Sequence, residues 1–518
     1  MDNYQKKSIK YYTFYVFFLL IVNLIYSKSI AQNTFVKTTH IKKLCSEVEA
    51  NPENLNAHHA FINALNRMDP LLPSQYETWT KRYPKSSTTF FAIGEMYAQM
   101  EDPKARDYLL QAVTIKPDLA AAWNLLSIDA QRRGSDSLSN TYIEKAAKAN
   151  PKNSEYALSY AFSFKDTNPV KYDSLALAVV RLFPNTEQAA QSLTLLAYYS
   201  NNDALKLAYF QQLYQMYLSH PTDWGRSGIG NYYNFLINKD PIKAFEIALS
   251  MVVASTTSEL KWRHMVRIAK SFIDARNLLQ SGKPEEAIKI LATVDLNNSW
   301  SVSYIDAEDT LVLFKAEAAD AAGRTQVAYD SLAVQYSNKP SDRLRPALLA
   351  YASKLGINEN QVDTAIWKLC DKRAKQADNF SLQGYPKSAR VSLNDYKGKV
   401  LLLTYWFPGC GPCRGEFPHF ESVLKKFKDK QVAYVGINID PSQDSYVIPF
   451  MKASGYSFTP LRNDPTQNKG YQPGAGGVPI NYLIDQKGRI IYSRFYINTL
   501  NDERTLELMI KEVLAAKD

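Results

Sequence analysis

The fold of the C-terminal part is decided by residues 404–418, which read TYWFPGCGPCRGEFP. A nearly continuous apolar run at 400–407 leads into this stretch, and a segment with helical periodicity continues from it to about Lys428. Such an apolar run is typical of a buried strand in a parallel or mixed sheet. The two cysteines of the stretch, Cys410 and Cys413, are therefore expected at the junction between a strand and a helix.

A Cys-x-x-Cys pair has two main interpretations, a redox centre and a metal site. Zinc needs a second pair of ligands, and the sequence holds neither another such cysteine pair nor two histidines at zinc-binding spacing. We therefore expect no metal and no bound cofactor. A cysteine at the start of a helix meets unpaired N–H groups and the positive end of the helix dipole, which stabilise its thiolate. This predicts Cys410 as the nucleophile and Cys413, one turn further along, as the resolving thiol.

The rest of the segment after about residue 377 alternates between strand-like and helical patterns. Apolar runs predict two further strands, and a turn pattern predicts a hairpin before a closing amphipathic helix. The expected elements are strands at 432–439 and 480–484, a helix around 446–454, a turn at 485–488 and a helix at 502–517. Strands that alternate with helices in this way are typical of an α/β domain.

Prolines recur at a regular interval in the first half of the chain. Pro52, Pro84, Pro117, Pro151 and Pro184 follow one another at intervals of 32, 33, 34 and 33 residues. The period predicts pairs of helices stacked in an all-α solenoid, in which proline ends each second helix and small residues let helices approach. Residues around the prolines resemble the tetratricopeptide repeat, namely Gly94, Tyr97, Ala105, Leu109 and Ala112, then Trp123, Leu126 and Ala146.

The N-terminus has the layout of a secretory signal peptide. Three lysines precede a mostly apolar run at 11–26, and Ser29 and Ala31 then supply small residues two apart. A retained membrane anchor is the alternative, although this run of 16 residues is shorter than the roughly 18–20 that span a bilayer. We expect cleavage near Ala31, no further membrane span, and residence in the periplasm or another exported compartment.

The composition excludes several broad classes of protein. The net charge of +10 comes from 61 basic and 51 acidic residues spread along the chain, so we expect no nucleic-acid partner. Hydrophobic residues make up 46% of the chain, which argues against wholesale disorder. Four cysteines in 518 residues do not make a disulfide scaffold. Whether Cys45 and Cys370 pair stays open.

The stretch around Cys410 resembles the active-site segment of thioredoxins, and more closely that of the exported TlpA/ResA-like thiol-disulfide oxidoreductases. Trp406 matches the Trp at the strand end in that family, and Pro418 matches its helix-kinking proline. Pro479 lies where the family carries a cis-proline that faces the cysteines. The resemblance implies that Trp406, Val478 and Pro479 take part in substrate binding, with the Val478 backbone pairing to an extended segment.

Four positions near the cysteines depart from the family pattern or allow two interpretations. Gly409 stands where Trp is common, and Thr404 stands where thioredoxins keep a buried Asp. Glu416, three residues past Cys413, is interpreted as a helix-surface carboxylate or salt-bridge partner in preference to a proton acceptor. Arg414 either is solvated or raises the positive potential near the nucleophile.

The repeat, strand and N-terminal patterns predict an exported chain of two domains, and the resemblance implies that it acts as a thiol-disulfide oxidoreductase. The expected segments are a signal peptide at 1–31, a tetratricopeptide-like repeat domain at 32–356, a linker at 357–376 and a thioredoxin-like domain at 377–518. Its Gly-Pro dipeptide matches that of thioredoxin, a reductant near −270 mV, so we expect a reductase. The expected partners are protein or small-thiol disulfides, an unidentified electron donor and a protein bound by the repeats.

Two alternatives stay open. One is a thiol peroxidase-like redoxin, although Phe407 stands where those proteins carry Thr. The other is a scaffold protein whose repeats bind a partner and whose thioredoxin fold serves only for docking.

Overall fold

The computed structural model describes residues 39–254, 259–296, 305–386, 390–427, 432–470 and 477–515. The predicted signal peptide at 1–31 lies outside these residues. The chain forms two compact units, divided between Asp129 and Ala130. Each unit is described by itself.

The first unit is all-helical. A helix at residues 39–50 precedes α2 (Leu55–Ala64), α3 (Leu71–Arg82), α4 (Ser87–Gln99), α5 (Ala105–Ile115) and α6 (Ala120–Arg132), the last of which runs across the division. Gly94 shows why a small residue recurs in the repeat. A Cβ atom at Gly94 would lie 2.9 Å from Cγ of Leu109, so only glycine lets α4 and α5 pack this closely.

The second unit begins with helices that continue the same pattern. They are α7 (Asp136–Ala149), α8 (Ser154–Phe162), α9 (Pro169–Leu182), α10 (Glu187–Tyr199), α11 (Asp203–Ser219), α12 (Asp223–Ile237), α13 (Pro241–Ala254), α14 (Glu259–Gln280), α15 (Pro284–Ala292), α16 (Ile305–Ala321), α17 (Thr325–Asn338), α18 (Arg345–Lys354) and α19 (Glu359–Arg373). Several begin at an Asn or Thr whose side chain accepts an N–H of the first turn, namely Asn153, Asn168, Thr186, Asn202, Thr222 and Asn358.

The periodic prolines lie where the repeat pattern predicts. Each of the five lies two residues after the last residue of a helix, so each ends the second helix of a pair. The prediction of an all-α helical repeat followed by an α/β domain is confirmed. In the region where the repeat pattern fades, the aromatic side chains are mainly core: Phe210, Tyr217, Tyr232 and Tyr233 are all buried.

The α/β domain is built on a mixed sheet. Within the described residues its strands are β1 (Lys375–Gln376), β2 (Ser381–Gly384), β3 (Arg390–Ser392), β4 (Val400–Trp406), β5 (Val432–Asn438), β6 (Thr459–Arg462), β7 (Ile480–Ile484) and β8 (Arg489–Phe495). They lie in the order β1-β8-β7-β4-β5-β6-β2-β3, with β4 parallel to β5 and antiparallel to β7. The strands predicted from the apolar runs are confirmed, and β4 is the central one.

Both faces of β4 are buried, which explains its unbroken apolar sequence. Val400 and Leu402 pack in the core that includes α20 (Gly411–Lys425), α21 (Asp444–Ser454) and α22 (Leu500–Ala515). Leu401 and Leu403 face a second core, formed with residues of β2, β5 and β7. Every residue of this strand is therefore covered.

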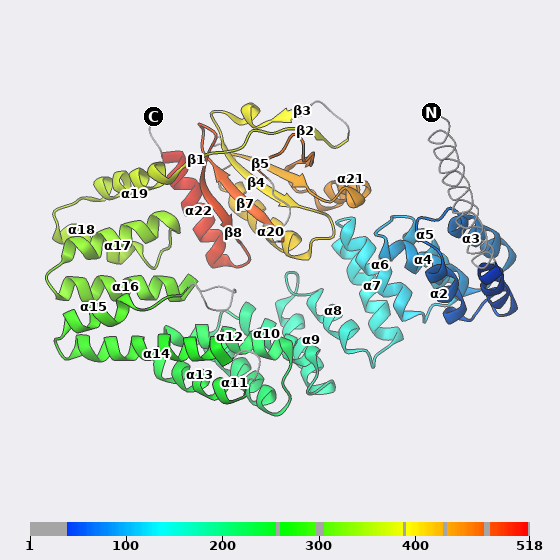
Figure 1. Cartoon of the computed structure of the whole chain (residues 1–518), viewed down its shortest axis with the longest axis horizontal. Helices are drawn as coiled ribbons and strands as arrows, with labels where there is room; N and C mark the ends of the chain where they lie inside the picture. Colours follow the sequence, from blue (N-terminus) through cyan, green and yellow to red (C-terminus); the bar gives the residue numbers. More distant parts are fainter. Residues whose placement is uncertain are drawn as a thin grey trace, which may run out of the picture. The chain divides into compact units, whose positions relative to one another are not determined.

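The segment expected as a linker at 357–376 is instead a packed helix followed by a strand. It forms α19 and β1, and Val362, Ile366 and Cys370 have no exposed surface. These three side chains belong to the same core as α22, so they join the helical repeats directly to the sheet domain. In Figure 1 the helices α7 to α19 curve around the sheet domain, and α19 lies beside β1 and α22.

Candidate active site

The cysteine pair lies at the junction between β4 and α20, as predicted. Cys410 is the N-cap residue of α20, and its Sγ accepts a hydrogen bond from the backbone N–H of Cys413 at 3.2 Å. The two cysteines form a disulfide. Cys410 is 4% exposed and Cys413 is fully buried, so an incoming thiol or disulfide reaches Cys410 first.

The segment before β7 lies against the disulfide. The peptide bond between Val478 and Pro479 is cis, as the family resemblance implies. The carbonyl oxygen of Val478 is 3.8 Å from Sγ of Cys410. Val478 is partly exposed, so its backbone is available beside the sulfur atom.

Trp406 does not offer a binding surface, contrary to the expectation from the resemblance. Its side chain has no exposed surface and packs among aromatic rings, with ring centroids 5.3 Å from Phe417, 5.0 Å from Phe450 and 5.1 Å from Phe458. A side chain that is covered on all sides cannot contact an incoming substrate in this conformation. Trp406 instead fills the core behind the disulfide.

A glutamine occupies the space beside the residue that precedes the nucleophile. The backbone N–H of Gly409 donates to Oε1 of Gln443 at 2.6 Å, and Nε2 of Gln443 donates to Asp440 at 3.2 Å. A Cβ atom at position 409 would lie 2.9 Å from that Oε1. Gln443 thus accounts for the glycine found where Trp is common in the family. The sequence carried no local signal for this contact, because the two residues lie 34 positions apart.

A buried polar network links β4 and β7 to the active-site helix α20. Thr404 Oγ1 donates to Asn481 Oδ1 at 2.9 Å, and Asn481 Nδ2 donates to the two carboxylate oxygens of Glu416 at 3.1 and 3.0 Å. The backbone N–H of Ile497 donates to Glu416 Oε1 at 2.7 Å. Thioredoxins keep a buried Asp at the position of Thr404. In this chain Thr404 is linked instead, through Asn481, to the buried carboxyl group of Glu416.

Glu416 is not the helix-surface carboxylate that we expected. Its side chain is fully buried, because the segment around Ile497 covers that side of α20. Burial raises the pKa of its carboxyl to about 8, although the hydrogen bonds from Asn481 and Ile497 oppose the rise. This pKa of the Glu416 carboxyl is close to the ordinary pKa of a thiol, which is about 8.5.

Arg414 is also not solvated. It is partly buried, and its Nη2 donates to Oε1 of Gln131 at 3.0 Å. Burial raises the pKa of Asp136, and the positive charge of Arg414 opposes that rise. Arg414 therefore connects the active-site helix to the end of α6.

No group of three or more His, Cys, Asp or Glu side chains among the described residues is placed to hold a metal ion. In the same parts of the chain, no helix is long and apolar enough to cross a membrane. Cys45 and Cys370, whose pairing the sequence left open, are both free thiols.

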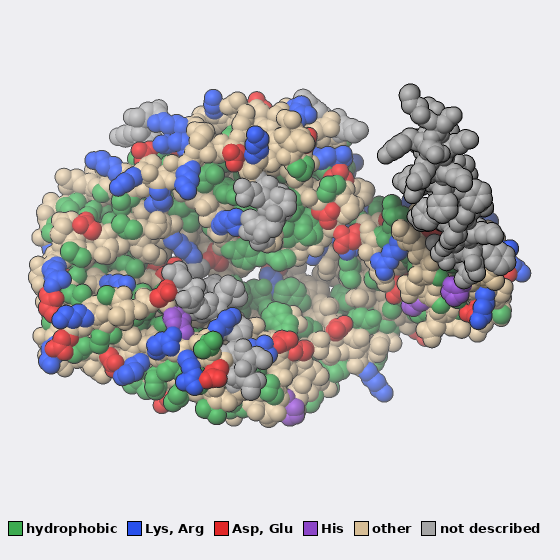
Figure 2. Space-filling model, viewed as in Figure 1, with side chains coloured by type: hydrophobic (Ala, Val, Ile, Leu, Met, Phe, Trp, Pro, Cys, Tyr) green, Lys and Arg blue, Asp and Glu red, His purple; other side chains and the backbone are tan. Residues whose placement is uncertain are grey.

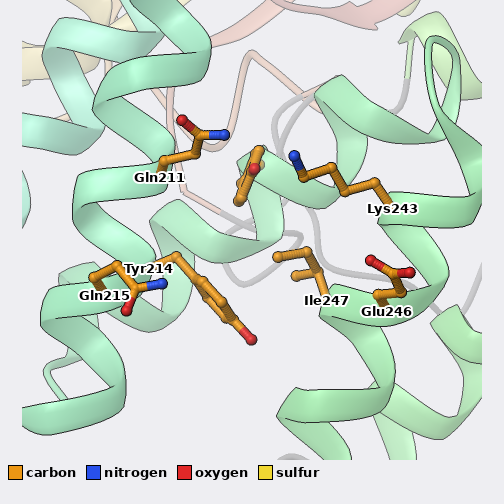
Figure 3. Close-up of a pocket in the computed structure, with 7 residues that line it drawn as sticks. Gln211, Tyr214, Gln215, Lys243, Glu246 and Ile247 are labelled. Atoms are coloured by element: carbon orange, nitrogen blue, oxygen red, sulfur yellow. The ribbon is translucent and has the colours of Figure 1, made fainter.

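A cavity of about 480 Å³ lies among the repeat helices (Figure 3). It is lined by side chains of α11, α12 and α13, namely Gln211, Tyr214, Gln215, Tyr232, Lys243, Glu246 and Ile247. In Figure 3 Gln211, Tyr214 and Gln215 come from one side and Lys243, Glu246 and Ile247 from the other. Its walls combine aromatic, amide and charged groups.

A mixed sheet with a disulfide at the strand-to-helix junction and a cis-proline opposite defines a thioredoxin-like redox protein. Residues 374–493 match the AhpC/TSA family. A thiol-disulfide oxidoreductase ResA of Bacillus thuringiensis (strain Al Hakam) is 31% identical over 117 residues, which cover 23% of this chain and 66% of the relative. The thioredoxin-like protein YneN of Bacillus subtilis (strain 168) is 33% identical over 121 residues, covering 23% of this chain and 69% of YneN.

The chain belongs, through this domain, to the family of thioredoxin-like thiol-disulfide oxidoreductases. The match spans just under two thirds of the ResA sequence and about a quarter of this chain. Among solved structures, a thiol:disulfide interchange protein of the thioredoxin family from Chlorobium tepidum TLS is 22% identical. The alignment covers 28% of this chain and 98% of that one, with a TM-score of 0.24.

Proposed function

We propose that this protein is an exported thiol-disulfide reductase that acts through Cys410 and Cys413. The observation that carries the proposal is the Cys410–Cys413 disulfide at the start of α20, 3.8 Å from the carbonyl of cis-bonded Val478. The family relationship of residues 374–493 supports the class of reaction. Export rests on the signal-peptide pattern at 1–31.

The reaction begins when the reduced protein meets a disulfide. The Cys410 thiolate attacks one sulfur of the substrate, so that a mixed disulfide forms and the other substrate sulfur leaves as a thiolate. The position of Cys410 at the N-cap of α20 favours its thiolate, because the N–H of Cys413 points at its Sγ. The thiol of Cys413 then attacks Sγ of Cys410. The substrate leaves as a dithiol, and the protein keeps the disulfide.

Glu416 is the proton acceptor for Cys413 in the second step. It lies one turn after Cys413 on the same helix, and its raised pKa of about 8 lets it take a thiol proton at little cost in free energy. The proton then passes to the departing substrate thiolate or to solvent. Two electrons have moved from the protein to the substrate, and a dithiol donor must restore them.

The backbone of Val478 holds the substrate segment. An extended chain that pairs with this edge places its own sulfur next to Sγ of Cys410, which is the β-strand addition mode of recognition. This mode needs backbone groups and not a particular side chain, so it suits substrates of varied sequence.

The repeat helices recruit a protein partner in this proposal. The cavity lined by α11, α12 and α13 supports this role, since the partly exposed Tyr214 offers aromatic surface and Lys243 and Glu246 offer charge. The Tyr214→Ala variant tests this role. We expect it to lose a partner protein that co-purifies with the wild type and to keep full activity toward small disulfides.

Insulin reduction and the reduction potential test the main proposal. The full chain is expected to reduce insulin with dithiothreitol as donor, and Cys410→Ser is expected to abolish the turnover. A reductase should have a potential nearer −270 mV than −120 mV, and a value above about −150 mV would contradict the direction. Two alternatives have distinct outcomes, because a thiol peroxidase would consume hydrogen peroxide and a scaffold would show no cysteine-dependent turnover.

A further inference from the structure

The end of α6 and the turn that leads to α7, together called the α6–α7 turn below, contact the thioredoxin-like domain beside the active-site helix. Gln131 accepts a hydrogen bond from Arg414, the residue directly after Cys413. The guanidinium of Arg133 lies 5.2 Å from the ring centroid of Tyr446, on α21. Both contacts belong to the second compact unit.

Gly134 brings this turn into close contact with α21. Its φ of +72° lies in the left-handed region, and a Cβ atom there would lie 2.7 Å from the backbone oxygen of Phe450. Two separate features therefore favour glycine at this position: the left-handed backbone conformation and the close approach of α21. The contact is tight enough that a single methyl group would displace it.

A second contact lies beside the next residue of the same helix, Gly415. Tyr198, near the end of α10, lies near the side chain of Asn498, which opposes the rise that burial causes in the pKa of Tyr198. Oδ1 of Asn498 is in turn 4.0 Å from the place where a Cβ atom of Gly415 would lie. The end of α10 therefore lies near the part of α20 that contains Gly415. Figure 2 shows the molecule hollowed between the sheet domain and the helices that face it.

We propose that the α6–α7 turn and the end of α10 are walls of the substrate site and restrict it to short or unfolded disulfide-containing segments. The inference rests on the proposed oxidoreductase function. Gly411 and Pro412, which follow Cys410 directly, are exposed, so substrate approaches Cys410 over them. A folded partner needs about 800 Å² of matching surface to dock stably. An extended segment needs only the width of a strand, about 5 Å.

The walls predict different rates for two kinds of substrate. The full-length protein, first reduced, is mixed with a short disulfide-bonded peptide or with a folded protein that carries a surface disulfide, and the second-order rate constants are measured. We expect the wild-type protein to react at least about tenfold faster with the peptide, which corresponds to about 1.4 kcal/mol of discrimination.

Gly134→Ala removes one wall, and Gly282→Ala is the matched control. Gly282 has nearly the same φ, +70°, but an added Cβ atom there meets nothing within 4 Å. Gly134→Ala should raise the rate constant for the folded substrate at least threefold and leave the peptide rate within twofold, whereas Gly282→Ala should change neither. Arg133→Ala, which removes the contact with Tyr446, should act in the same direction if Gly134→Ala fails to fold.

Two results would overturn the inference. One is a wild-type protein that reacts equally fast with both substrates. The other is a folded-substrate rate that neither Gly134→Ala nor Arg133→Ala changes beyond the effect of Gly282→Ala. A wild-type protein that reduces neither substrate would overturn the proposed function itself, so the two failures are distinguishable.

Discussion

At the scale of single residues, Glu416 is where the sequence and the structure differ most. Position on a helix, three residues after Cys413, was compatible with a surface carboxylate. The segment around Ile497 covers that face of α20, and helical periodicity carries no information about a segment 81 residues later. Local sequence likewise carries no information about the contact of Gln443 with Gly409, because the two residues lie 34 positions apart. By contrast, Cys410 and Cys413 were predictable, because their roles follow from local spacing and from the helix start.

Replacing Glu416 by Gln should slow the resolving step. The amide keeps the volume of the side chain but cannot accept the proton of Cys413, so we expect the step to slow by about 10²-fold or more. Stopped-flow measurement of mixed-disulfide decay between pH 6 and 9 checks this. In wild type the rate should rise through the ionisation near pH 8. Glu421→Gln, on the same helix and not fully buried, is the control, and an equal effect of both variants would contradict the assignment.

The same carboxyl group predicts a pH dependence of stability. Its pKa is about 8 in the folded protein and about 4.3 in an unfolded chain, so the folded state binds more protons between these values. The free energy of unfolding should therefore fall as pH rises from about 4 to 8. In Glu416→Gln this decline should be smaller by at least about 1.4 kcal/mol, the equivalent of one pKa unit. Denaturant titrations of both proteins at pH 5 and pH 8 measure it, and parallel declines would contradict the prediction.

At the scale of elements, the long strands and helices were predictable and the short ones were not. β4, β5 and β7 each carry an apolar run that is buried, and the prolines fixed the ends of the paired helices. The short strands are β1, β2, β3 and β6, which have only two to four residues each and include polar side chains. Their pairing with neighbouring strands stabilises them, and their own sequences carry no hydrophobic pattern that predicts a strand. The prediction of a linker at 357–376 was wrong for a related reason. The side chains of this segment are buried by packing with α22, which lies more than a hundred residues later in the sequence.

Two glycines in α12 test how closely the repeat helices pack. A Cβ atom at Gly228 would lie 2.3 Å from Leu213 Cδ2 and from Thr194 Oγ1, whereas one at Gly230 would meet nothing within 4 Å. Gly228→Ala should destabilise the protein by about 1–3 kcal/mol through overpacking. Gly230→Ala should stabilise it by about 0.5–1 kcal/mol, because alanine favours the helix. Thermal unfolding of both variants checks this, and equal shifts would show that packing around α12 is not this tight.

At the scale of the whole molecule, the sequence predicted what the parts are but not how they meet. The order of a helical repeat and an α/β domain follows from periodicity and composition. The contacts of Gln131 with Arg414 and of Tyr198 with Asn498 join positions about 300 residues apart, and no local pattern encodes them. Both contacts lie at the helix that carries the disulfide, where we propose the walls of the substrate site.

Trapping of the mixed disulfide tests the central claim most directly. The Cys413→Ser protein, mixed with a disulfide substrate, should accumulate a covalent adduct, and mass spectrometry should locate the bond at Cys410. Cys410→Ser should form no adduct under the same conditions. Cys370→Ser, which removes a buried free thiol, should behave like wild type. An adduct formed by Cys410→Ser but not by Cys413→Ser would contradict the account.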